Sequence, residues 1–270
     1  MSEARPDAVF HLDGDRAVPT GFARGPWSPH AMHGGAPAAL IARAVERHDP
    51  GPASFVARLT IELLRPVPLV PLEVGARTVR PGKKVQWIEV SLTADGTEVV
   101  RATALRLRTD PALALQVPEP APLAMPGPAR SEPIVLDLGE AGWGERSEIG
   151  FAKVFELRAA HGSFGVPGPA GLWFRLAVPL VAGEEPSALQ RVAAAADFGN
   201  GVSALFGDGR HSFINADLTV SLWRLPAGEW VGIDSVSHAS PDGVGVAESM
   251  LVDEQGHLGR ALQSLLVDRS

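Results

Sequence analysis

The chain has 270 residues, of which 45% are hydrophobic, so it can bury a sizeable core as one large or two small globular domains. Its net charge of −7 excludes the overall basic field that attracts nucleic acid or an anionic membrane surface, and we expect neither partner. The lack of cysteine excludes disulfides and thiolate ligands, and because the eight histidines lack zinc-binding spacing we expect no metal site. No apolar run approaches the roughly 18–20 residues of a membrane span, which predicts a cytoplasmic protein.

The first half of the chain begins with one helix. Gly34 and Gly35 precede the helical pattern APAALIARAVERH at residues 36–48, with a proline in its first turn and apolar residues at helical spacing. Four extended segments rich in β-branched or alternating residues follow, at 54–66, 72–80, 85–96 and 98–108. The pattern predicts one helix followed by four strands.

A proline-rich segment separates this half from the rest of the chain. Its prolines, between Pro111 and Pro133, forbid both a helix interior and a central strand. We therefore predict an N-terminal domain over residues 1–110, a linker over 111–135 and a C-terminal domain over 136–270.

The second half repeats the order of elements. Ser187 and Gln190 form a capping box at the start of a helix that runs through four alanines to Asp197, and the chain is predicted to break at Gly199-Asn200-Gly201. Strand patterns follow at 211–225, 229–240, 244–256 and 257–269, and two more precede the helix at 152–158 and 172–178.

The two halves are related by a constant offset in residue number. Adding 159 to a position of the first half superimposes identical residues on three of the four strands: Leu59 on Leu218, Thr60 on Thr219, Leu63 on Leu222, Arg65 on Arg224, Glu89 on Glu248, Leu92 on Leu251, Arg101 on Arg260 and Ala102 on Ala261. So constant an offset indicates an internal duplication. We predict an α+β fold of two tandem units, each an antiparallel sheet wrapped around a central helix, packed as a pseudo-dimer.

Several short signatures in a fixed order resemble the acyl-CoA thioesterase II family, the double hot-dog thioesterases. They are HGG at His33–Gly35, LLRP at Leu63–Pro66, LWFR at Leu172–Arg175, AAD at Ala195–Asp197, SLW at Ser221–Trp223 and LQSLLV at Leu262–Val267. The resemblance covers most of the chain outside the linker. It implies hydrolysis of a fatty acyl-CoA thioester, with coenzyme A as part of the substrate and no separate cofactor. Because many hot-dog proteins pair further, we also expect a homodimer.

In that family an aspartate, a threonine or serine, and a glutamine position the attacking water. The resemblance places Asp197 and Gln263 at the first and last of these positions. The middle position falls on Asp217, where a hydroxyl is expected, and Thr219 lies two residues further on. The resemblance thus leaves the middle position open between Asp217 and Thr219.

The residues themselves leave alternatives for each candidate. Asp197 at a helix C-terminus faces the negative end of the helix dipole, at a typical cost of about 0.3–1 kcal/mol, which favours a basic carboxylate; alternatively it only caps the helix. Gln263 is either a buried amide that shares a water with Asp197 or an edge-strand residue facing solvent. Under the offset these residues correspond to Ala38 and Ala104, and Asp217 to Arg58, so the polar groups belong to the second half alone.

The remaining candidates are weaker. Asp217 alternates with Asn215, Thr219 and Ser221, opposite the apolar Ile214, Ala216, Leu218 and Val220, so a solvated strand face is the default interpretation. Gly34 and Gly35 present backbone N–H groups to an oxyanion or simply allow a tight entry into the helix, and His33 is a candidate polar residue of the substrate site.

Two other functions remain open. One is a non-catalytic acyl-CoA-binding or structural hot-dog protein. The other is an acyl-CoA hydratase of the same fold, a reaction that pairs a histidine with an aspartate; the helix that carries Asp197 has no histidine beside it.

Overall fold

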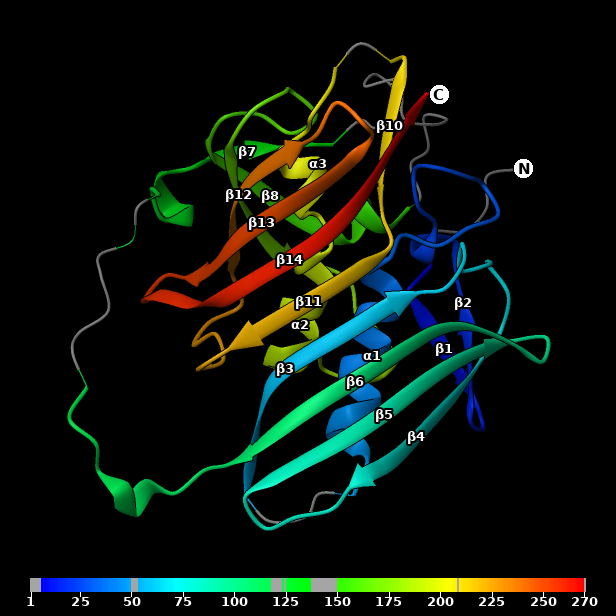
Figure 1. The fold of residues 1–270 in the computed structure, drawn as a ribbon, viewed down its shortest axis with the longest axis vertical. Helices are drawn as coiled ribbons and strands as arrows, with labels where there is room; N and C mark the ends of the chain where they lie inside the picture. The colour runs from blue at the N-terminus through cyan, green and yellow to red at the C-terminus, as the bar shows by residue number, and fades with distance from the viewer. Residues whose placement is uncertain are drawn as a thin grey trace.

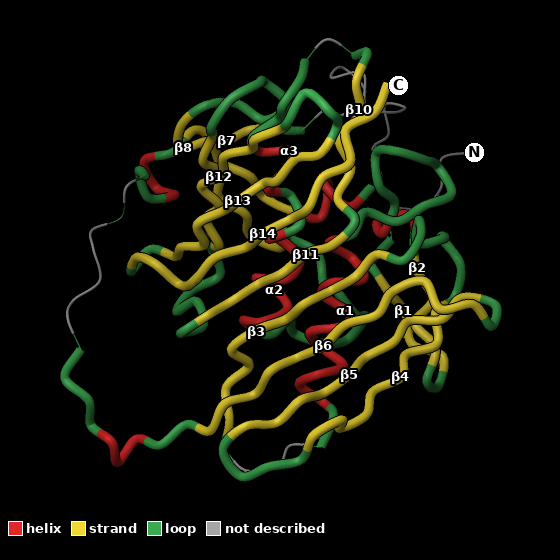
Figure 2. The backbone as a smooth tube through the Cα atoms, in the orientation of Figure 1, coloured by secondary structure: helices red, strands yellow, loops and turns green. Residues whose placement is uncertain are grey.

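The computed structural model describes residues 6–49, 53–117, 123, 125–136, 150–207 and 209–269. Its centre is a single 14-stranded antiparallel sheet with two main helices packed side by side against one face (Figures 1 and 2). The predicted α+β class is confirmed, and each half of the sheet wraps one of the helices.

The N-terminal half contains one helix and six strands. Helix α1 spans Gly35–Arg47 and is followed by β3 (Ser54–Leu63), β4 (Leu72–Arg80), β5 (Val85–Ala94) and β6 (Thr97–Arg108). A hairpin of β1 (Phe10–Asp13) and β2 (Arg16–Pro19) precedes the helix, and β2 pairs with β4. The 3₁₀ turn η1 (Gly21–Ala23) leads from this hairpin towards α1.

The C-terminal half repeats this arrangement. Strands β8 (Phe155–His161) and β9 (Ala170–Leu176) precede α2 (Ala188–Ala196) and the short α3 (Gly199–Val202). Strands β10 (His211–Asn215), β11 (Asp217–Leu222), β12 (Val231–Ala239), β13 (Val244–Asp253) and β14 (Gly256–Arg269) follow. Additional short elements are η2 (Pro111–Leu113), η3 (Pro128–Arg130), β7 (Glu132–Ile134) and η4 (Phe151–Val154).

The strand order makes the sheet nearly symmetric about its middle. It runs β1-β2-β4-β5-β6-β3-β11-β14-β13-β12-β9-β8-β7, with β10 also paired to β14. Adding the sequence offset to the bounds of β4 and β5 gives the bounds of β12 and β13. At the seam between β3 and β11, Thr60 lies directly opposite Thr219, its own counterpart. A pseudo-two-fold axis therefore passes through this pair of threonines.

The helices lie at the centre of the core. Helix α2 buries Leu189, Val192 and all four alanines from Ala193 to Ala196, while α1 buries Leu40, Ile41 and Val45. Small side chains on α2 allow the two helices to approach each other closely. Among the described helices, none is long and apolar enough to cross a membrane.

Two local predictions about the second helix need correction. The Ser187 hydroxyl accepts a hydrogen bond from the Gln190 N–H at 3.1 Å, but the Gln190 side chain donates to Glu46 of α1 instead of completing a capping box. The segment Gly199-Asn200-Gly201 is not a break, because it forms α3. The hydrogen bonding instead changes to the 3₁₀ type at Phe198, whose N–H donates to the Ala195 carbonyl at 3.0 Å.

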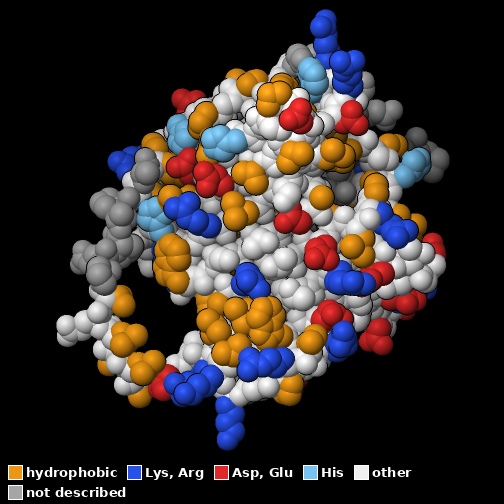
Figure 3. All heavy atoms as spheres, viewed as in Figure 1, with side chains coloured by type: hydrophobic (Ala, Val, Ile, Leu, Met, Phe, Trp, Pro, Cys, Tyr) orange, Lys and Arg blue, Asp and Glu red, His pale blue; other side chains and the backbone are white. Residues whose placement is uncertain are grey.

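The predicted linker, 111–135, contains structure in its described part. Strand β7 pairs with β8 at the end of the sheet, and η2 and η3 lie before it. The described part around η2 lies away from the body of the molecule in Figure 1, and Figure 3 shows hydrophobic side chains there. Residues 118–122 and 124 of this linker, and 137–149 of the predicted C-terminal domain, lie outside the described residues. The predicted domain boundaries stay predictions.

Candidate functional site

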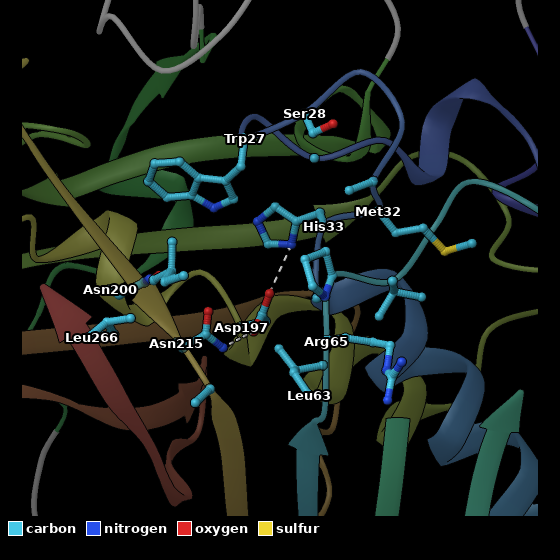
Figure 4. A pocket seen from close by; sticks show the side chains of 17 residues that line it. Trp27, Ser28, Met32, His33, Leu63, Arg65, Asp197, Asn200, Asn215 and Leu266 are labelled. Carbon is cyan, nitrogen blue, oxygen red and sulfur yellow. Dashed lines mark hydrogen bonds and ion pairs between the residues drawn. The ribbon is translucent and has the colours of Figure 1, made fainter. Parts of the chain in front are cut away.

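A pocket of about 390 Å³ lies where the two halves of the chain meet (Figure 4). The N-terminal half supplies the segment before α1 and the end of β3, and the C-terminal half supplies the end of α2, α3, β10 and β14. The lining is largely apolar; its members include Trp27, Met32, Leu63, Val67, Ile214 and Leu266. Such a lining suits an apolar ligand with a few polar anchoring groups.

Asp197 is the carboxylate that lines this pocket, and its side chain is only 4% exposed. Its Oδ2 lies 3.0 Å from His33 Nδ1, and its Oδ1 accepts a hydrogen bond from Asn215 Nδ2 at 2.8 Å. Gln263 Nε2 approaches the same Oδ1 at 3.3 Å. Figure 4 draws the contacts with His33 and Asn215 as dashed lines. A nearly buried carboxylate is thus held by three polar side chains from three different segments.

The ends of both helices set the electrostatics of Asp197. It is the C-cap residue of α2, as the sequence predicts, so it faces the negative end of that helix. The structure adds the N-terminus of α1: a Cβ on Gly34, the N-cap residue of α1, would lie 2.7 Å from Asp197 Oδ2. The positive end of α1 therefore opposes the unfavourable dipole of α2, an effect of about 0.3–1 kcal/mol for each helix end.

Gln263 is 1% exposed and lies behind Asp197 rather than in the pocket wall. Its Nε2 donates to the Asp197 carbonyl oxygen at 3.1 Å, and its Oε1 accepts from the Asn200 N–H at 2.9 Å. Gly199 permits this contact, since a Cβ there would lie 2.8 Å from Gln263 Oε1. The sequence expectation that Gln263 faces inward is met, but its amide orients Asp197 and does not itself line the pocket.

Asn215 is a site residue that the sequence pattern placed wrongly. Continuous alternation over 211–225 put Asn215 on the solvated face with Asp217, and Ile214 on the apolar face. In the structure the strand is interrupted at Ala216, between β10 and β11. The alternation of inward and outward side chains is shifted by one residue at this point, so that in β10 Phe213 is buried and Ile214 is exposed. The interruption turns Asn215 inward, where Nδ2 also donates to the Asp217 carbonyl at 3.2 Å.

The same irregularity occurs in the N-terminal half. The pairing of β3 with β6 shifts register between Val56 and Arg58, the counterparts of Asn215 and Asp217 under the sequence offset. The omitted residue is Ala57, the counterpart of Ala216. A bulge of this kind redirects side chains and leaves no strong sequence signal when the extra residue is alanine.

The other candidates for the middle position do not contact Asp197. The Asp217 carboxylate accepts a hydrogen bond from the Ser264 backbone N–H at 2.6 Å. Thr219 lies at the seam opposite Thr60. Neither Asp217 nor Thr219 lines the pocket, and the polar side chain nearest to that role is Asn215.

His33 has a closer relation to Asp197 than the sequence suggested. Its ring stacks against both Phe151 and Phe198, with centroid distances of 5.2 and 4.2 Å. It comes from the segment before α1. The helix that carries Asp197 has no histidine beside that residue, as the sequence indicates, but the N-terminal half supplies one.

Two groups approach the same ring nitrogen of His33. The Gly35 N–H points at Nδ1 from 3.0 Å, and Asp197 Oδ2 lies at the same distance. Because a backbone N–H can only donate and Nδ1 has one in-plane lone pair, a bare Nδ1 accepts a hydrogen bond from Gly35. When Nδ1 carries a hydrogen, it donates instead to the Asp197 carboxylate, and the Gly35 contact is no longer a hydrogen bond. The pair can therefore pass one proton between carboxyl and imidazole.

The two glycines before α1 play different parts. The N–H of Gly35 is engaged by His33, and a Cβ on Gly35 would collide with the Ala194 carbonyl oxygen at 2.6 Å. Gly34 lines the pocket, and no described residue accepts a hydrogen bond from its N–H. Of the two predicted oxyanion donors, the Gly34 N–H is the one that remains available.

Models of two protein-family domains match this chain. The acyl-CoA thioesterase N-terminal domain matches residues 23–107, and the acyl-CoA thioesterase C-terminal domain matches residues 128–267. The chain belongs to the acyl-CoA thioesterase family. The resemblance seen in the short sequence signatures is thereby confirmed.

Solved structures of this family's fold superimpose on nearly the whole chain. A presumed thioesterase from Novosphingobium aromaticivorans has a TM-score of 0.72 at 21% identity, covering 96% of this chain and 98% of its own. A hot-dog protein of unknown function from Alicyclobacillus acidocaldarius has a TM-score of 0.71 at 18% identity, covering 98% and 97%. The acyl-CoA thioesterase II TesB2 of Mycobacterium marinum has a TM-score of 0.63 at 15% identity, covering 90% and 92%. These likenesses establish the double hot-dog fold. A search among curated proteins finds no match.

Proposed function

We propose that this protein hydrolyses acyl-CoA thioesters to a free acid and coenzyme A, with Asp197 activating the attacking water. The observation that carries the proposal is a nearly buried carboxylate that lines an apolar pocket and is held by His33, Asn215 and Gln263. A carboxylate fixed in this way can accept the proton of a water as the water attacks the thioester carbonyl carbon.

The oxygen of that carbonyl becomes negatively charged as the water adds. The Gly34 N–H, at the positive end of α1 and without a described partner, is placed to donate to this oxygen. When the tetrahedral intermediate collapses, the carbon–sulfur bond breaks and the sulfur takes up a proton. The proton that Asp197 has received, relayed through His33 or directly, satisfies that need.

Asn215 and Gln263 act by positioning in this proposal. Both amides direct N–H groups at Asp197 Oδ1, and Gln263 is itself fixed by the Asn200 N–H. They hold the carboxylate in one rotamer and leave Oδ2 for exchange with His33. Pre-ordering of this kind removes the cost of orienting the base during the reaction.

The test is thiol release from a series of acyl-CoA substrates of different chain lengths. For Asp197→Ala we expect turnover to fall by about 10²–10⁴-fold, the usual contribution of a general base. Gln263→Ala should lower turnover less, because Asp197 remains. Unchanged turnover in both variants would overturn the site assignment, and absence of thiol release by the parent would favour a protein that binds acyl-CoA without hydrolysing it.

A second candidate function is hydration of an α,β-unsaturated acyl-CoA. The observation that favours it is the contact of 3.0 Å between His33 Nδ1 and Asp197 Oδ2, since adding water across a carbon–carbon double bond needs one group to accept a proton and another to deliver one. The two functions separate cleanly when 2-enoyl-CoA is supplied. Hydration consumes the conjugated double bond without liberating thiol, whereas hydrolysis liberates thiol from saturated and unsaturated substrates alike.

A further inference from the structure

Arg65 and Arg224 occupy equivalent positions in the two halves but have different surroundings. Each follows the seam strand of its half, and the sequence offset relates them. The Arg224 guanidinium is bound by the carboxylate of Asp253 through two hydrogen bonds, from Nη1 at 2.6 Å and Nη2 at 2.7 Å. This carboxylate also accepts from the Ala227 and Gln255 N–H groups, at 2.9 and 2.8 Å. These hydrogen bonds to Asp253 form a structural clamp that occupies the Arg224 guanidinium.

The N-terminal half lacks the groups that form this clamp. Ala94 stands where the second half has Asp253, and Pro68, which has no N–H, stands in place of Ala227. The segment after Arg65 turns instead towards the loop that carries His33: the Met32 N–H donates to the Val67 carbonyl at 2.8 Å, and Ala31 bridges Pro68. The segment after Arg224 thus completes the clamp in the C-terminal half, whereas the equivalent segment after Arg65 lines the pocket.

Arg65, by contrast, lies at the edge of the pocket without a clamp of this kind. It is exposed, it lines the pocket, and no described residue gives its guanidinium a hydrogen bond or an ion pair. Figure 4 shows its side chain just past the end of β3. Among the described residues that line the pocket, it is the one lysine or arginine, beside a single carboxylate, Asp197. A planar guanidinium with free donors at the rim of an apolar pocket suits an anion with several oxygen acceptors.

We propose that Arg65 binds the phosphate of the phosphopantetheine arm that carries the acyl group, and so selects phosphorylated thioesters over neutral ones. An acyl chain is apolar and fits the buried lining, whereas the arm's phosphate must stay near solvent, where Arg65 lies. This inference depends on the proposed function only for the claim that the other end of the arm carries a thioester. The phosphate is common to coenzyme A and to an acyl carrier protein, and the contact with Arg65 is the same for both.

Calorimetric binding tests this without any need for turnover. Coenzyme A, 4′-phosphopantetheine and pantetheine are titrated into the parent, into Arg65→Gln, and into Arg80→Gln, a matched variant that removes an exposed arginine of the same half outside the pocket. We expect Arg65→Gln to weaken the two phosphorylated ligands about tenfold, to leave pantetheine unchanged, and Arg80→Gln to behave like the parent. An equal loss for all three ligands, or no loss for the phosphorylated pair, overturns the proposal.

Turnover then identifies the source of the phosphate. With the same acyl group on coenzyme A and on a purified acyl carrier protein, the substrate whose KM rises about tenfold in Arg65→Gln at unchanged kcat is the one that uses this contact. A lower kcat with unchanged KM on both overturns the role as a binding residue. If phosphopantetheine binding depends on Arg65 but no thioester is hydrolysed, the proposed function fails and the assignment of Arg65 stands.

Discussion

The inner faces of the two half-sheets have the same register but different chemistry. Positions related by the sequence offset hold Val56 and Asn215, Ala104 and Gln263, Ala76 and Ser235, and Val90 and Ser249. In the N-terminal half these residues are apolar and pack around α1; in the C-terminal half they are polar and surround α3 and Asp197. The hydroxyls of Ser235 and Ser249 are buried and hydrogen-bonded to each other.

The difference separates the residues that make the fold from those that serve the site. The order of strand pairing, the irregularity at Ala57 and Ala216, and the bounds of β4 and β5, which recur in β12 and β13, are common to both halves, so they do not depend on the polar residues. The polar set is confined to one half, yet His33 comes from the other. Although the chain contains two copies of the same scaffold, we therefore expect only one complete site, at the junction between them.

Among the residues that hold Asp197, giving the C-terminal half the residue of its counterpart should have the largest effect at Asn215. Asn215→Val removes the 2.8 Å hydrogen bond to Asp197 Oδ1 and leaves that oxygen with Gln263 alone. We expect thiol release to fall about 100-fold, within the range for a group that orients a base, with little change in KM. Asn215→Asp, which keeps the shape and removes the donor, should be equally impaired. Activity close to the parent in both variants would contradict the role of Asn215.

Exchanging residues at Gln263 and Ala104 separates stability from activity. Gln263→Ala leaves the Asn200 N–H and the Asp197 carbonyl without their partner, which should lower the free energy of unfolding by about 1–3 kcal/mol and reduce turnover about tenfold. The reverse change, Ala104→Gln, buries an amide among apolar residues and should cost a similar free energy while leaving kcat unchanged. Denaturant unfolding and thiol release measure both. Loss of activity in Ala104→Gln would mean that the two halves are coupled through their cores.

The clamp at Asp253 predicts a pH dependence that the equivalent position of the N-terminal half, Ala94, cannot have. Burial raises the pKa of Asp253, but hydrogen bonds from Arg224, Ala227 and Gln255 overcome it and hold the pKa below its ordinary value. A lowered folded-state pKa contributes stability above the unfolded value of about 3.9 and loses it as the pH falls through the folded value.

Asp253→Asn should accordingly destabilise the protein at pH 7 by about 2 kcal/mol, since charged hydrogen bonds are lost. Its difference from the parent should shrink as the pH falls below about 4. Thermal unfolding from pH 7 to pH 3 checks this, with Asp95→Asn, at an exposed turn, as a control. A difference that stays constant with pH would show that the loss is steric.

The smallest effects are expected at Asp217 and Thr219, the two residues that the resemblance offers for the middle position. In Asp217→Asn the side-chain oxygen can still accept from the Ser264 N–H, and Thr219→Val alters only the seam pair with Thr60. Turnover should stay within about twofold of the parent, as for changes away from the reacting groups. A loss comparable with that of Asn215→Val would restore Asp217 or Thr219 as the residue that positions the water.

Much of the fold could be predicted because the duplication makes the same order of strand patterns appear twice in the sequence. Residue patterns predicted four strands in each half, the constant offset related the two sets, and the strand bounds of β12 and β13 repeat those of β4 and β5 at that offset. Asp197 could be singled out because a carboxylate ends a run of alanines. Asn215 could not, since an alternation rule assumes an unbroken strand and Ala216 gives no sign of the interruption. His33 could not be assigned to Asp197, because they lie in different halves of the sequence and only the packing of α1 against α2 joins them.

The edge-to-edge pairing of β3 with β11 has a consequence for the chain that connects them. Since the halves meet as two folded pieces would, the covalent connection between β6 and β7 acts by raising the effective concentration at which each half encounters the other. Proteolytic cleavage there would leave every contact in place yet make the assembly sensitive to dilution. His33 would then leave with one fragment and Asp197 with the other, so the site would vanish before either sheet unfolded.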